Sequence, residues 1–153
     1  MSLKYSLEKI SSTVSCIREN DPWGANPLMY LINGSMQNVL IDTGCGTGDL
    51  RSFVNEHLGE CRRLTVINTH NHAEQTGANW RFSTTGKYGL APEVNELCAG
   101  SADPYYTKLE DTSFAWQVKT YKITKWLHHE EVVRLDSEGE NELLALHTPG
   151  TIS

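Results

Sequence analysis

Two histidines one residue apart, His70 and His72, lie in the stretch INTHNHAEQTGANW at residues 67–80. Side chains at positions i and i+2 of an extended segment project to the same side, so both imidazoles can bind one ion. Glu74 and Gln75 follow in the same stretch and add two oxygen donors. Two interpretations are open at this point: a metal site, or a polar loop whose ends the histidines cap.

A third histidine favours the metal interpretation. His147 follows the apolar run ELLAL and precedes Thr148-Pro149-Gly150. If this run and the apolar run before His70 are strands of one sheet, all three imidazoles converge at one edge of that sheet. Three neutral nitrogen ligands and one water suit catalytic zinc, which lowers the pKa of its bound water to about 7.

Most segments that would position these histidines have the composition of β-strands. Runs rich in β-branched and aromatic residues alternate with turn residues, and Asn33-Gly34 between two apolar runs indicates a hairpin. Apolar residues at helical spacing indicate one helix before Gly59, and Pro92 indicates the first turn of another. The sequence therefore predicts strands over 4–10, 13–19, 28–34 and 63–69 and one ending at 42, helices over 47–58 and 92–100, and a second hairpin over 131–148.

Length and composition are typical of one soluble globular domain over residues 1–153, with 39% hydrophobic and 21% charged residues. The 13 basic residues are scattered and the net charge is −6, which argues against a nucleic-acid partner. No apolar run reaches membrane-spanning length, and the N-terminal residues lack a signal-peptide pattern. Because the four cysteines form no C-x-x-C pair, we expect reduced thiols and a cytoplasmic protein without membrane contact.

The stretch VLIDTGCGTGDL offers a different enzyme class. An apolar strand, three alternating glycines (Gly44-x-Gly46-x-Gly48) and a helix are similar to the cofactor loop of methyltransferases that use S-adenosylmethionine. Such sites need an acidic residue at the end of the next strand to hold ribose hydroxyls, but here that strand ends in Asn-Thr-His. We therefore expect the glycines to form the turn after Asp42, with the methyltransferase as an alternative.

The motifs NVLIDTG, THNHAEQTGAN and HTPG occur in this order, and together they resemble the metallo-β-lactamase superfamily over residues 12–153. The resemblance implies an α/β fold, the αββα sandwich, with metals at the edge between its two sheets. It also implies a zinc-dependent hydrolase in which metal-bound hydroxide attacks an ester, thioester or amide carbonyl of a small-molecule substrate. By motif position His70, His72 and His147 would bind the first metal, Asp42 would orient a ligand, and Glu74 would be the base.

Two residues depart from the family pattern T-H-x-H-x-D-H-x-G-G. Glu74 stands where the family has the aspartate that binds a second metal, and its side chain is one methylene longer. Gln75 stands where the family has a histidine, and an amide oxygen is a weak zinc ligand. We therefore expect Glu74 and Gln75 to be weak ligands and the chain to hold one zinc ion instead of two.

The chain ends at HTPGTIS, where the family continues with the second half of its sandwich. That half supplies a bridging aspartate and a last histidine ligand, so the resemblance implies a domain truncated at its C-terminus, with reduced or lost activity. The alternative is a non-catalytic relative or fragment that acts as a binding module. An inner sheet face carrying Val39, Ile41, Val66 and Leu144 would lack its opposing layer, which predicts self-association.

Overall fold

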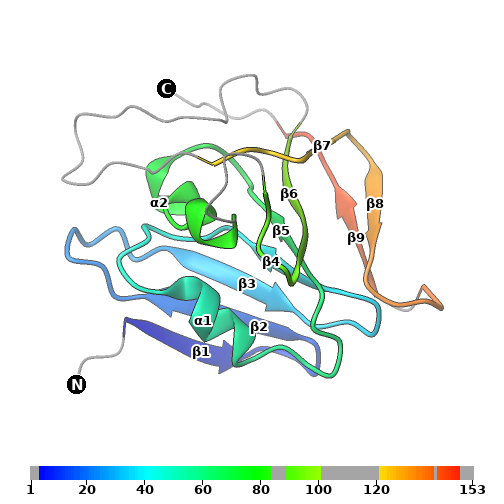
Figure 1. Cartoon of the computed structure of the whole chain (residues 1–153), viewed down its shortest axis with the longest axis horizontal. Coiled ribbons are helices and arrows are strands. Elements are labelled where there is room, and N and C mark those ends of the chain that lie inside the picture. Colours follow the sequence, from blue (N-terminus) through cyan, green and yellow to red (C-terminus); the bar gives the residue numbers. More distant parts are fainter. Residues whose placement is uncertain (1–3, 84–88, 101–120, 140, 149–153) are drawn as a thin grey trace.

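Antiparallel pairing of the N-terminal runs builds one half of a large sheet. The computed structural model describes residues 4–83, 89–100, 121–139 and 141–148. The first four strands form a meander in which each strand is antiparallel to the one before it (Figure 1). The predicted strands and the hairpin at Asn33-Gly34 are confirmed. The four strands are β1 (Tyr5–Lys9), β2 (Val14–Glu19), β3 (Leu28–Ile32) and β4 (Asn38–Ile41).

Parallel pairing builds the other half of this seven-stranded sheet, whose order is β1-β2-β3-β4-β5-β6-β7. Parallel neighbours need crossover connections. One helix, α1, lies along the chain between β4 and β5, and α2 with a 3-10 helix, η1, lies between β5 and β6. The carboxyl ends of β4 and β5 therefore meet at one edge of the sheet. The remaining elements are β5 (Leu64–Ile67), β6 (Val94–Gly100), β7 (Lys125–Leu127), α1 (Leu50–Asn55), α2 (Ala73–Thr76) and η1 (Asn79–Phe82).

The helix predicted over 92–100 is wrong, because this segment is the strand β6. β6 lies between β5 and β7, and its residues Leu97, Cys98 and Ala99 are all buried. A short apolar run that is covered on both faces has no periodicity that separates a buried strand from a buried helix. Pairing with two neighbouring strands decides the outcome, and Pro92 precedes the strand instead of opening a helix.

The helix predicted over 47–58 forms only between Leu50 and Asn55. The side chain of its N-cap residue, Asp49, accepts the backbone N–H of Ser52 at 3.2 Å, which satisfies one of the free donors at the helix start. Leu50 and Val54 lie on the buried face of this short helix. No helix within the described residues is long and apolar enough to cross a membrane.

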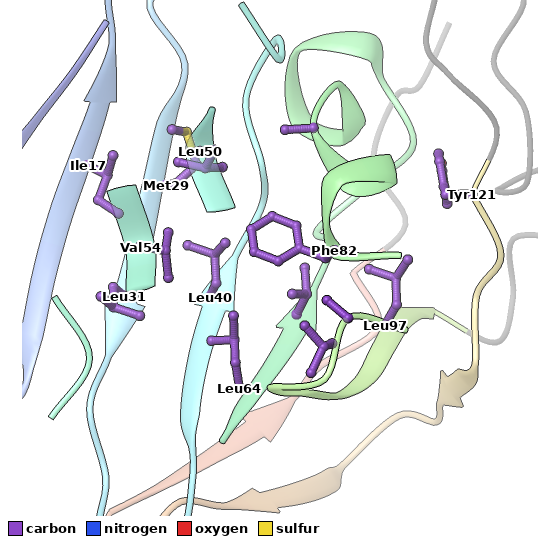
Figure 2. Packing of buried hydrophobic residues seen from close by; sticks show 14 of the residues in the cluster. Ile17, Met29, Leu31, Leu40, Leu50, Val54, Leu64, Phe82, Leu97 and Tyr121 are labelled. Atoms are coloured by element: carbon purple, nitrogen blue, oxygen red, sulfur yellow. The ribbon is translucent and has the colours of Figure 1, made fainter. Parts of the chain in front are cut away.

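Different elements pack against the two faces of the seven-stranded sheet. Side chains of α1 and η1 pack on one face, where Figure 2 shows Phe82 lying among Leu40, Leu64 and Leu97. Consecutive residues of a strand point to opposite faces, so Leu40 belongs to this cluster and Val39 to the other one. Part of the second face packs against a two-stranded sheet of β8 (Glu131–Arg134) and β9 (Glu142–Ala145), which confirms the predicted second hairpin.

The prediction that one uncovered inner face carries Val39, Ile41, Val66 and Leu144 is wrong, because these residues do not share a face. Val39 is fully buried in a cluster with Leu135, whereas Val66 lies in the cluster on the helix-covered face. Leu144 is 56% exposed and pairs with Val132, which is also exposed. The alternation of side chains in each strand therefore divides these residues among three surfaces. Self-association stays a prediction.

Arg51 and Glu93 join α1 to the segment before β6. Arg51 donates through Nε and Nη2 to the two carboxylate oxygens of Glu93 at 2.7 and 2.8 Å, and Asn55 donates to the same carboxylate at 2.7 Å. The hydrogen bonds from Arg51, followed by the one from Asn55, outweigh burial and lower the pKa of Glu93 from 4.5 to about 2. This contribution to stability is therefore complete above pH 4.5 and is lost as the pH falls towards 2.

We predict that Glu93→Gln lowers the free energy of unfolding at pH 7 by about 1–2 kcal/mol, a range discounted because Arg51 is partly exposed to solvent. Urea unfolding at pH 7 and at pH 3 measures the effect, and the difference from the unmodified chain should shrink at the lower pH. Glu60→Gln, at an exposed position, is the control. An equal loss at both pH values would contradict this account of Glu93.

Candidate functional site

Asp42 ties the ends of β4 and β5 together. It follows β4 with φ 66°, a left-handed conformation that aspartate tolerates better than most residues. Its Oδ1 accepts the backbone N–H of Thr69 at 2.8 Å, and its Oδ2 accepts the Thr69 hydroxyl at 2.7 Å. The segment that carries His70 is therefore held by a buried carboxylate.

The buried position of Asp42 changes its acidity. Burial raises the pKa of Asp42 to about 6, and the hydrogen bonds from Thr69 oppose that rise. Folding thus favours the protonated carboxyl, and this contribution is present below pH 3.8 and lost as the pH rises through about 6. At neutral pH Asp42 is a buried anion that needs the donors of Thr69.

His70 and His72 lie next to each other, with ring centroids 4.7 Å apart in an edge-to-face arrangement. His72 occupies the N-cap position of α2, but its side chain makes no capping hydrogen bond. His72 therefore has the position of a cap residue, but its imidazole does not act as the cap. Burial and then the neighbouring His72 lower the pKa of His70, which favours the neutral imidazole that metals bind.

Two acceptor oxygens beside this pair lack a hydrogen-bond partner. Glu74 and Gln75 lie in the first turn of α2, and Oε2 of Glu74 and Oε1 of Gln75 are buried without a hydrogen bond. A buried polar atom left unsatisfied costs about 1–3 kcal/mol, and more if it is charged. A cation or a ligand with donor groups would relieve that cost.

His147 is not brought to the same place by the described residues. β9 pairs with β8 in the separate two-stranded sheet, so the condition for convergence of the three imidazoles, one sheet shared by both strands, is not met. The backbone N–H of His147 donates to Nδ1 of His129 at 2.9 Å. Throughout the described part of the chain, no group of three or more His, Cys, Asp and Glu side chains gathers around one point. Pro149 and Gly150 of the HTPG motif lie outside the described residues.

The glycine loop after Asp42 encloses a carboxylate from its own chain. Glu19 is 2% exposed and accepts the backbone N–H groups of Cys45 at 2.8 Å and Thr47 at 3.1 Å, with the Thr47 hydroxyl at 2.6 Å. A Cβ added at Gly44 would lie 2.2 Å from Oε1 of Glu19. The backbone donors that a cofactor phosphate or carboxylate would use are thus already engaged, contrary to the methyltransferase interpretation.

Sequence reasoning missed the polar residues that hold α2 and η1 against the strand ends. Asn68 and Asn79 exchange amide hydrogen bonds of 2.7 and 3.1 Å, and the Thr43 hydroxyl donates to Oδ1 of Asn79 at 2.7 Å. Thr43 also accepts the backbone N–H of Ala78 at 3.2 Å. Asn68 and Thr69 stand directly before His70, and this adjacency was the available signal. Nothing in the sequence pointed to Glu19.

The sequence matches the Metallo-beta-lactamase superfamily over residues 23–152. Acyl-coenzyme A thioesterase MBLAC2 of Bos taurus is 27% identical over 143 residues, covering 80% of this chain and 50% of the relative. The Homo sapiens protein of the same name is 25% identical with the same coverage. The chain thus spans about half the length of the curated relatives it matches.

Solved structures share the fold. A metallo-beta-lactamase from Pontibacter korlensis has a TM-score of 0.58 at 13% identity, with 90% of this chain and 58% of that chain covered. DIM-1 metallo-beta-lactamase exposed to ceftazidime has a TM-score of 0.56 at 14% identity, with 95% and 60% covered. The chain belongs to the metallo-beta-lactamase superfamily and has its α/β fold, as the motifs predicted. That superfamily is typically zinc-dependent.

We predict that Glu19→Ala lowers the free energy of unfolding by about 2–4 kcal/mol, because three donors of the glycine loop lose their acceptor. Thermal and urea unfolding measure the loss, and Glu8→Ala on an exposed part of β1 is the control.

Calorimetric titration of the unmodified chain with S-adenosylmethionine should give no binding heat. Micromolar affinity for S-adenosylmethionine would overturn this assignment of the loop.

Proposed function

We propose that this chain provides the metal-binding part of a zinc-dependent hydrolase that cleaves a small-molecule thioester. The observation that carries the proposal is the pair of neighbouring imidazoles, His70 and His72, beside the two unpartnered buried acceptors of Glu74 and Gln75. The thioester is favoured over the ester and the amide because the curated relatives are named acyl-coenzyme A thioesterases.

In this proposal His70 and His72 hold the ion, and His147 is a third ligand assigned by its HTPG motif alone, because the described residues do not bring it beside the pair. A zinc ion bound there would polarise the substrate carbonyl and lower the pKa of a bound water. Glu74, with one buried oxygen free of partners, accepts the proton from the attacking water. Asp42 does not touch substrate, and acts by holding the segment that carries His70.

The proposal is for one tightly bound ion per chain. Gln75 offers only an amide oxygen, and zinc prefers imidazole nitrogen, thiolate sulfur and carboxylate oxygen. Glu74 offers a carboxylate, but α2 and the loop before it carry no imidazole other than the two of the H-x-H pair. A second metal at this position would therefore lack the nitrogen ligand that its affinity requires.

A non-catalytic binding module is the second candidate. It is favoured by the position of His147, whose strand lies in the two-stranded sheet and whose backbone contacts His129. A two-histidine site binds an ion more weakly than a three-histidine site, and the ion would then serve to bind an anionic group without turnover. The two candidates differ in whether the metal-loaded chain releases a thiol product.

We predict one zinc ion per chain after equilibrium dialysis and elemental analysis. His72→Ala should abolish tight binding, since it removes one imidazole of the H-x-H pair, and Gln75→Ala should change the affinity by less than about threefold. His128→Ala removes an exposed histidine outside the pair and serves as the matched control. Two tight ions per chain would contradict the proposed stoichiometry.

We predict that the zinc-loaded chain hydrolyses acyl-coenzyme A thioesters and that Glu74→Gln lowers kcat/KM about 10²-fold, because the proton acceptor is lost. Chromatographic detection of released coenzyme A measures the rate. Glu138→Gln, at an exposed position, controls for the change of charge. Zinc binding without any release of coenzyme A would favour the binding module.

A further inference from the structure

We propose that Thr69 is a positioning residue whose hydroxyl fixes the tautomer of His70. The oxygen Oγ1 of Thr69 lies between two partners: Oδ2 of Asp42 at 2.7 Å and Nδ1 of His70 at 2.8 Å. These three side chains form one hydrogen-bonded row from the end of β4 to the candidate metal ligand. The metal side of the inference rests on the proposed function, whereas the tautomer can be tested without metal.

Counting protons decides the direction of the row. An ionised carboxylate can only accept hydrogen bonds, and a threonine hydroxyl has one proton to donate. Oδ1 of Asp42 already accepts the backbone N–H of Thr69, so the hydroxyl proton goes to Oδ2. The contact between Oγ1 and the His70 ring then requires a proton on Nδ1, and His70 is the donor.

The proton on Nδ1 determines the state of Nε2, the other ring nitrogen of His70. A neutral imidazole with its proton on Nδ1 has its lone pair on Nε2, which is then the ligand atom. A hydrogen bond of this kind at the far nitrogen also fixes the plane of the ring and raises its basicity as a ligand. Thr69 thus transmits the fixed position of the Asp42 carboxylate to the ring of His70.

The hydroxyl is separable from the structural role of Thr69. The backbone N–H of Thr69 braces the strand ends whichever side chain is present, since its hydrogen bond to Oδ1 of Asp42 at 2.8 Å does not involve the hydroxyl. Thr69 is exposed, so a valine of the same shape fits without repacking a core. In the described part of the chain the His72 ring makes no comparable hydrogen bond, which makes His72 an internal comparison.

The test uses the full chain labelled with nitrogen-15 at histidine, metal-free at pH 8, and compares it with Thr69→Val and Thr69→Ser. Two-bond nitrogen–proton correlation spectra report which ring nitrogen carries the proton. We expect His70 to be in the Nδ1–H form in the unmodified chain and in Thr69→Ser. Thr69→Val should shift His70 towards the Nε2–H form, with His72 unchanged and the melting temperature within a few degrees.

Zinc affinity is the second measurement, made by competition with a chromogenic chelator. Thr69→Val should weaken zinc binding about 10–100-fold and Thr69→Ser should restore it. His70 in the Nε2–H form in the unmodified chain would overturn the inference, even if zinc binds tightly. The Nδ1–H form in a chain that does not bind zinc would uphold the tautomer assignment and refute the proposed function.

Discussion

The rest of the site depends on one buried anion, the carboxylate of Asp42. It lies at the point where two parallel strands end, and its two oxygens take both donors of Thr69. Parallel strands leave their carboxyl ends side by side without a connecting turn, so another group must hold the outgoing segments in register. The left-handed backbone at Asp42 costs about 1–3 kcal/mol, and such strain persists only where several contacts fix it.

A second buried carboxylate, on another strand of the same sheet, also holds a loop in place. Glu19, at the end of β2, gathers the backbone donors of the loop between β4 and α1. Gly46 of that loop would place an added Cβ 2.5 Å from the carbonyl oxygen of Gly77, just beyond α2. The loop fixed by Glu19 therefore forms the surface on which α2 rests, and α2 carries Glu74 and Gln75. Two buried carboxyl groups thus hold the segments on both sides of the site.

Local patterns were enough to predict the strands up to β5, both hairpins and the H-x-H pair, because each depends on alternation, turn residues or motif spacing. β6 was missed because its buried apolar run has no period of its own and forms a strand through its two neighbours. The sheet that holds β9 was missed for a related reason: alternation identifies a strand but not its partner. Glu19 could not be found because its role depends on donors 26 and 28 residues away along the chain.

Gln75, which stands where the family motif has a histidine, changes the electrostatics of the site. A histidine at position 75 would bring a ring nitrogen that can either donate or bind a metal, whereas Gln75 presents a buried oxygen that can only accept. Its neighbour Glu74 has a second buried oxygen without a hydrogen-bond partner. Two like dipoles of this kind repel each other in a low-dielectric environment unless positive charge lies between them. Both oxygens therefore favour a cation or a donor-bearing ligand at this edge of the sheet.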